Sequence, residues 1–130
     1  MELKVGITNE ISKQVTEPDL AVSMSSGALR VYATPAMIAL MENCAASCVA
    51  PYLGGGMTTV GTAVDIKHVS ATPPGHTVHC TAVLEEIDRR RLVFTVRAFD
   101  EAGLIGEGRH ERFIVEPAKF LARAGDKFGK

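Results

Sequence analysis

Three residues of the sequence supply a hydroxyl, a carboxylate and an imidazole: Thr34, Glu42 and His68. Glu42 is the only charged residue in residues 35–50, a segment whose other side chains are apolar or small. Its carboxylate should therefore be paired or have a raised pKa. Those conditions suit a general base or a nucleophile. Thr34 precedes Glu42 by eight residues, a little over two helical turns, so both side chains can share one helix face.

Each of these residues also has a structural explanation. Thr34 directly precedes Pro35, so it is predicted to be a helix N-cap, although a hydroxyl there can also favour developing negative charge. Glu42 can lie on an exposed strip or pair with a structural cation. A single histidine in a strand, such as His68, is more often structural than catalytic.

Other residues could assist a ligand. Gly61 lies within a strand-like segment, which indicates either a β-bulge or a close approach of backbone to ligand. His110 and Arg112 are two residues apart and therefore share one face of a strand. Arg112 can pair with an acid or hold a substrate carbonyl or phosphate. The run Arg89–Arg91 is typical of a solvated turn, but it could also meet the phosphates of a nucleotide-bearing ligand.

The elements that would position these residues are one helix and several strands. Residues 35 to about 50 are predicted to form a helix, opened by Thr34-Pro35 and ended before Pro51. Its sides are all apolar or small apart from Glu42, so it is predicted to be buried all round. The predicted strands cover residues 3–16, 57–70, 76–88, 92–99 and 104–116; residues 17–33 form a loop or short strand, and 117–123 a terminal helix.

Short turns join the later strands, and short turns imply antiparallel neighbours. One apolar helix against such a sheet is an α+β architecture, and a sheet wrapped round a long central helix is the hotdog arrangement. We expect a single domain over residues 1–130. Because the sheet leaves an edge strand and a helix end uncovered, we also expect a homodimer, which could associate further.

Composition excludes several classes of protein. The 130 residues carry a net charge of −1, and no RNP, KH or zinc-finger signature is present, so no nucleic-acid partner is expected. No apolar run approaches the roughly 20 residues that a membrane span requires. Three cysteines and no signal peptide favour the cytoplasm, and Cys44 and Cys48 are predicted to be core residues rather than metal ligands. No metal or cofactor is expected.

Short motifs in the chain resemble those of the hotdog-fold thioesterases related to fluoroacetyl-CoA thioesterase. The resemblance covers roughly residues 30–120. Its motifs are Ala33-Thr34, Leu40-Met41-Glu42, Ala50-Pro51-Tyr52-Leu53, Val60-Gly61-Thr62-Ala63, His68 with Ala71-Thr72-Pro73-Pro74-Gly75, and Gly108 to Arg112.

The resemblance implies that Thr34, Glu42 and His68 form the catalytic set and that Gly61 and Arg112 help to hold the substrate. It implies an acyl-CoA substrate and a pocket at the dimer interface. Glu42 would act as nucleophile or base and His68 as acid and base. Thr34 would orient groups or form a transient acyl adduct, and no choice between Thr34 and Glu42 as nucleophile follows.

The chain departs from this family just before the helix. The fluoroacetyl-specific enzyme carries a Phe-rich lid there, whereas residues 25–28 are Ser-Ser-Gly-Ala. We therefore expect a small or short-chain acyl group and no specificity for fluoroacetyl. The alternative function is a non-catalytic acyl-CoA binding or sensing module. A third, a hotdog hydratase or dehydratase, fits less well because those enzymes use a different His/Asp or His/Glu arrangement.

Overall fold

A computed structural model describes residues 2–129 of the chain. It contains five strands, two α-helices and two short 3-10 turns. In chain order the elements are β1 (Thr8–Gln14), η1 (Glu17–Asp19), α1 (Thr34–Val49), η2 (Ala50–Tyr52), β2 (Thr58–His68), β3 (Thr77–Asp88), β4 (Arg91–Asp100), β5 (Gly103–Val115) and α2 (Pro117–Asp126).

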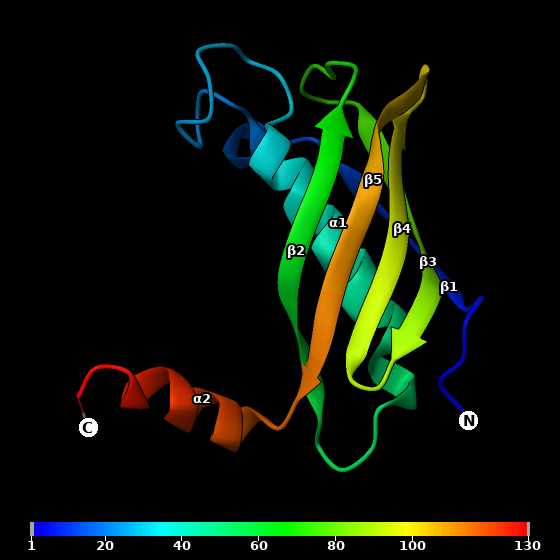
Figure 1. Cartoon of the computed structure of the whole chain (residues 1–130). Coiled ribbons are helices and arrows are strands. Elements are labelled where there is room, and N and C mark those ends of the chain that lie inside the picture. The colour runs from blue at the N-terminus through cyan, green and yellow to red at the C-terminus, as the bar shows by residue number, and fades with distance from the viewer. Residues whose placement is uncertain (1, 130) are drawn as a thin grey trace.

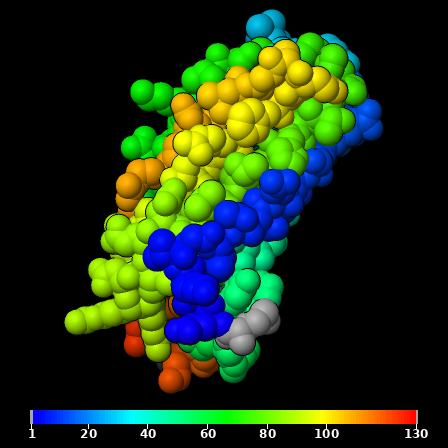
Figure 2. All heavy atoms as spheres, turned by 90° about the vertical axis from the view of Figure 1, so that its right-hand side faces the viewer, coloured from blue at the N-terminus to red at the C-terminus, as the bar shows by residue number. Residues whose placement is uncertain are grey.

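The strands form one antiparallel sheet in the order β1-β3-β4-β5-β2. The sheet curves round α1, and α2 stands away from this body at the end of β5 (Figure 1). Figure 2 shows β1, in blue, running along the outer edge of the sheet. This is the predicted α+β arrangement. Within residues 2–129, no helix is both long and apolar enough to cross a membrane.

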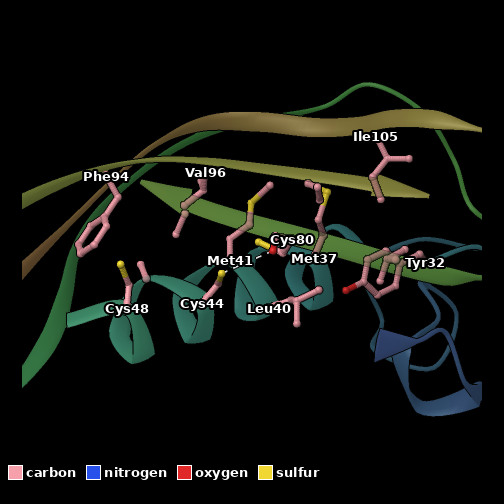
Figure 3. Packing of buried hydrophobic residues seen from close by; sticks show 14 of the residues in the cluster. Tyr32, Met37, Leu40, Met41, Cys44, Cys48, Cys80, Phe94, Val96 and Ile105 are labelled. Carbon is pink, nitrogen blue, oxygen red and sulfur yellow. Dashed lines mark hydrogen bonds between the residues drawn. The ribbon is translucent and has the colours of Figure 1, made fainter. Parts of the chain in front are cut away.

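The core lies between α1 and the concave face of the sheet (Figure 3). Side chains spaced three and four residues apart on α1 are buried there, as helical periodicity requires. They are Met37, Leu40, Met41, Cys44, Ala45, Cys48 and Val49. On β3, alternate residues face α1, and four of them are fully buried: Val78, Cys80, Ala82 and Leu84. The cysteines are free core residues, as predicted.

The prediction that α1 is buried on every side is wrong for this chain. One sheet covers only one side of a helix, and the opposite side of α1 remains partly or fully exposed. We call this side the open strip; it consists of Thr34, Ile38, Ala39, Glu42, Asn43, Ala46 and Ser47. The side chains of the open strip are mostly small, so the sequence of α1 looks apolar or small on every side. It therefore does not show which side the sheet leaves uncovered.

Strands β2 and β5 approach each other closely. Their register shifts between Gly61 and Ala63, which is a β-bulge. Further along, a Cβ atom on Gly108 would overlap the backbone of Asp65 and Ile66, so only glycine fits there without moving a strand.

Candidate functional site

The first residue of α1 and the last residue of β2 meet at one end of the helix. The Oγ1 atom of Thr34 lies 2.8 Å from Nδ1 of His68, a hydrogen bond between side chains 34 residues apart. The predicted N-cap role of Thr34 is wrong, because Ala33 holds the cap position with an extended backbone (φ −74°, ψ 140°). The hydroxyl of Thr34 is thus available to His68.

The imidazole of His68 is suited to accept a proton. Burial lowers its pKa below the ordinary value, so the ring is neutral at neutral pH. Its Nε2 atom is buried and has no hydrogen-bond partner among residues 2–129. A buried polar atom without a partner is uncommon, and at a pocket it indicates a position for a ligand group.

A pocket of about 310 Å³ opens beside this pair. Its lining combines apolar and hydroxyl-bearing side chains from the loop before α1, the start of α1, the end of β2 and the residues that follow β2. They include Ser26, Val31, Tyr32, Thr34, His68 and Ser70. The volume suits a small group, and the hydroxyls can hydrogen-bond to it.

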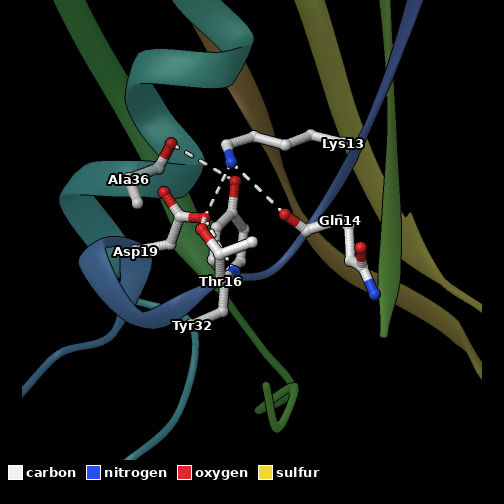
Figure 4. A network of polar contacts seen from close by, with 6 residues as sticks. All are labelled: Lys13, Gln14, Thr16, Asp19, Tyr32 and Ala36. Carbon is white, nitrogen blue, oxygen red and sulfur yellow. Dashed lines mark hydrogen bonds and ion pairs between the residues drawn. The ribbon is translucent and has the colours of Figure 1, made fainter. Parts of the chain in front are cut away.

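A polar network holds the start of α1 in place (Figure 4). Asp19 accepts hydrogen bonds from the backbone N–H and the hydroxyl of Thr16, at 2.9 and 3.0 Å, and pairs with Lys13 at 2.8 Å. The backbone N–H of Ala33 donates to the carbonyl oxygen of Asp19 at 2.8 Å. These contacts tie the end of β1 to the helix and so fix the residue that precedes Thr34.

A second group of residues lies further along α1. Glu42 is half-exposed, and its Oε2 lies 4.0 Å from Nη1 of Arg112, an ion pair without a direct hydrogen bond. Gly61 separates the two side chains: a Cβ atom there would be 2.9 Å from Oε2 of Glu42 and 3.4 Å from Nη1 of Arg112. The predicted β-bulge at Gly61 is confirmed, and Glu42 and Arg112 lie close to its backbone; an approach of ligand to this backbone stays a prediction.

Arg112 is held rigidly in the interior. Its Nε donates to the hydroxyl of Thr59 at 2.8 Å and its Nη2 to the carbonyl oxygen of Thr59 at 3.0 Å. Nη1 lies 3.1 Å from Nε2 of His110, which confirms that Arg112 and His110 share a face of β5. Sequence reasoning missed Thr59 because its contact with Arg112 depends on the register of β2 against β5.

The predicted catalytic set is not assembled within one chain. Thr34 and His68 form one pair, while Glu42, Gly61 and Arg112 form a separate cluster. Eight residues of α-helix correspond to about 12 Å along the axis, so Glu42 lies well beyond hydrogen-bond reach of the Thr34 end. Both groups border the open strip.

All three arginines of the run line a cavity of about 630 Å³, together with Asp88 and Phe113. Arg91 also pairs with Glu86 and Glu111, at 3.0 and 2.9 Å, and so has a structural role as well. In the part of the chain that the structure describes, no group of three or more His, Cys, Asp or Glu side chains is arranged to bind a metal.

Comparison with known proteins identifies the relatives of this chain. Residues 15–118 match the family described as fluoroacetyl-CoA-specific thioesterase. The fluoroacetyl-CoA thioesterase of Streptantibioticus cattleyicolor is 43% identical over 97 residues, which are 75% of this chain and 70% of that protein. The chain belongs to this thioesterase family.

Solved structures agree with that membership. A structure of fluoroacetyl-CoA thioesterase superposes with a TM-score of 0.91 at 34% identity, over 98% of each chain. A variant of that enzyme was solved with fluoroacetate and CoA; it has a TM-score of 0.86 at 35% identity and covers 91% of this chain and 99% of its own. A hot-dog-like protein from Thermanaerovibrio acidaminovorans, 23% identical, covers 98% of this chain and 95% of its own with a TM-score of 0.89. The hotdog fold and the family resemblance are thus confirmed, and the predicted class of enzyme, a thioester hydrolase, is that of the family.

Proposed function

We propose that the chain hydrolyses the thioester of a small or short-chain acyl-CoA, releasing the free acid and CoA. The observation that carries the proposal is the 2.8 Å hydrogen bond between Thr34 and His68 beside a small pocket. A hydroxyl bonded to a neutral imidazole is the arrangement of an activated nucleophile or an oriented hydrogen-bond donor. The relative solved with fluoroacetate and CoA supports a CoA thioester as substrate.

The chemistry divides between the two groups of residues. In the direct route, His68 takes a proton from a water that adds to the thioester carbonyl carbon, and passes it to the CoA sulfur as the C–S bond breaks. In the covalent routes, the acyl group first moves to the Thr34 hydroxyl, whose proton reaches the sulfur through His68, or to the Glu42 carboxylate, with CoA leaving as the thiolate. Water activated by His68 then hydrolyses the acyl adduct, so that each route consumes one water and gives acid and CoA. Gly61 and Arg112 hold the substrate, because the guanidinium offers fixed N–H donors beside an accessible backbone.

Thiol release from purified protein tests this proposal. Wild-type protein should hydrolyse at least one acyl-CoA, and Glu42→Gln and His68→Ala should each lower kcat by about 100-fold or more. Val64→Thr, an exposed change on the same strand as His68, is the control and should keep full activity. Tight acyl-CoA binding without turnover would instead support the binding-module alternative.

The small acyl group is part of the proposal. It is supported by the pocket volume of about 310 Å³ and by the absence of Phe from residues 25–28. A panel of acetyl-, propionyl-, butyryl-, octanoyl- and fluoroacetyl-CoA should show the highest kcat/KM among the short chains and no preference for fluoroacetyl over acetyl. A strong fluoroacetyl preference would contradict this specificity.

We also infer that the active form is a homodimer with sites shared between subunits. Ile38 lies halfway between Thr34 and Glu42 on the open strip. A twofold axis beside Ile38 would pack the two α1 helices antiparallel and bring Glu42 of the partner subunit to the Thr34–His68 pair. The same contact would cover the open strip.

Two experiments test the shared site. Thr34→Ala and Glu42→Gln proteins, each inactive alone, should recover about a quarter of wild-type activity when unfolded and refolded together, since half of the dimers are mixed and have one intact site. Ile38→Cys should form a disulfide with its own copy under oxidation, whereas Ser47→Cys, further along the strip, should not. Failure of both would contradict the shared site.

A cytoplasmic location belongs to the proposal as well. Its support is chemical, because Cys44, Cys48 and Cys80 are free and buried, as suits a reducing compartment.

A further inference from the structure

We propose that His110 is a positioning residue that sets the direction of the Arg112 guanidinium and keeps it from neutralising Glu42. This inference rests on the proposed function of the Glu42–Arg112 cluster. The His110 side chain is fully buried and does not line the pocket beside Thr34. A buried imidazole is costly unless its ring nitrogens are hydrogen-bonded, so its two contacts are informative.

Those two contacts fix the protonation of the ring. Nδ1 of His110 lies 2.8 Å from the carbonyl oxygen of Ala63, which can only accept, so Nδ1 carries the proton. Nε2 lies 3.1 Å from Nη1 of Arg112, which can only donate, so Nε2 offers its lone pair. His110 is therefore a neutral ring in one tautomer. Burial also lowers its pKa, which agrees with this assignment.

The acceptor atom Nε2 of His110 binds one particular nitrogen of Arg112, Nη1. Thr59 binds Nε and Nη2, and His110 binds Nη1. Nη1 is also the nitrogen that faces Glu42, at 4.0 Å from Oε2. Without the lone pair of His110, Nη1 would carry a buried N–H donor that has no acceptor. The carboxylate of Glu42 would then be only a short movement away. A direct hydrogen bond to Glu42 would satisfy this donor.

The same ring connects Arg112 to the bulge. Ala63 follows the register shift that begins at Gly61, and Gly61 pairs across the strands with Arg112. A Cβ atom on Gly61 would come within 3.3 Å of Cε1 of His110. The imidazole thus sets the spacing between the Gly61 backbone and the guanidinium, the two groups proposed to hold the substrate. Stacking on Phe94, with ring centroids 6.3 Å apart, keeps the imidazole in its plane.

Two conservative variants separate the acceptor from the donor. His110→Gln places an amide oxygen near the Nε2 position and keeps an acceptor for Arg112. His110→Asn places an amide nitrogen near the Nδ1 position, keeps the bond to Ala63 and loses the acceptor. We expect kcat to fall at least about tenfold in His110→Asn relative to His110→Gln, with similar unfolding temperatures.

Crystal structures of both variants provide a readout that does not depend on activity. The separation of Nη1 and Oε2 should shorten from 4.0 Å to hydrogen-bond distance in His110→Asn and should stay long in His110→Gln. Equal separations in the two variants would overturn the positioning role. If wild-type protein hydrolyses no acyl-CoA, the proposed function fails, and the two separations still decide the role of His110. If the wild-type protein does hydrolyse an acyl-CoA, equal kcat values in His110→Asn and His110→Gln would overturn the effect of His110 on catalysis.

Discussion

At the scale of single residues, the buried His110 and the half-buried His68 have opposite arrangements. His110 has a partner for each ring nitrogen, whereas His68 has Thr34 on Nδ1 and a buried Nε2 without a partner among residues 2–129. The first is therefore fixed by its surroundings, and the second retains capacity for a ligand. Burial lowers the pKa of both rings.

The lowered pKa of His68 predicts how the reaction responds to acid. A neutral imidazole is required as the proton acceptor, and its folded pKa lies below the ordinary value of about 6.5. The midpoint of the acid-side decline in kcat/KM for an acyl-CoA should therefore lie below pH 6.5. A pH–rate profile over pH 4.5–8 checks this; a midpoint above pH 6.5 would contradict it.

Gly61 predicts a loss of activity without a loss of stability. In Gly61→Ala the new methyl group would meet Oε2 of Glu42 at 2.9 Å, and the end of this half-exposed side chain can move away. The methyl group would also lie 3.3 Å from Cε1 of His110, a contact that a shift of a few tenths of an ångström relieves. The kcat/KM should fall about tenfold or more, while the free energy of unfolding changes by less than about 1 kcal/mol. Gly54→Ala, with no atom within 4 Å of its Cβ position, is the matched control and should change neither.

At the scale of elements, α1 holds the fold together through one face. Leu40 is 7% exposed in the core, and Leu121 on α2 is 68% exposed. The same substitution at both positions isolates burial: Leu40→Ala should cost about 2–5 kcal/mol of unfolding free energy. Leu121→Ala should cost less than about 0.5 kcal/mol. Urea unfolding of both variants measures the difference, and equal costs would contradict the assigned core.

Much of this architecture was predictable because it follows from local patterns. Residues 57–70 alternate with β-branched side chains and residues 78–84 have one apolar face, and both patterns predict strands. Pro51 predicts the end of α1. The N-cap was predicted wrongly because the backbone of Ala33 is held by Asp19, a contact outside any local motif. The eight-residue spacing already sets Glu42 about 12 Å from Thr34 along the helix axis. That His68 meets the Thr34 end of α1 depends on how β2 crosses the helix, which spacing along the chain does not encode.

At the scale of the whole molecule, charge is nearly balanced but unevenly distributed. Arg90 and Phe113 line two cavities, of about 630 and 120 Å³, and Lys119 and Arg123 line the smaller one. Within residues 2–129, none of these three cations forms an ion pair, whereas Arg97 pairs with Glu107 at 3.3 Å. This end of the molecule is therefore locally positive in a chain of net charge −1.

The basic end predicts a dependence on the phosphates of CoA. Arg90→Ala should raise KM for an acyl-CoA about three- to tenfold and leave KM for the matching acyl-pantetheine unchanged, because only CoA carries the nucleotide phosphates. Arg97→Ala should leave both values unchanged. Equal KM changes for both substrates would show that Arg90 acts on something other than phosphate.

The close approach of β5 to β2 at Gly108 limits how this enzyme could be engineered. A side chain there would collide with the backbone of Asp65 and Ile66, and backbone cannot turn aside as a rotamer can. In a library that randomises β5, only the glycine codon should survive selection for folded protein at this position. Its exposed neighbours Glu107 and Arg109 should accept many residues. Substrate range is thus better altered through the loop before α1 than through the strand that carries Arg112.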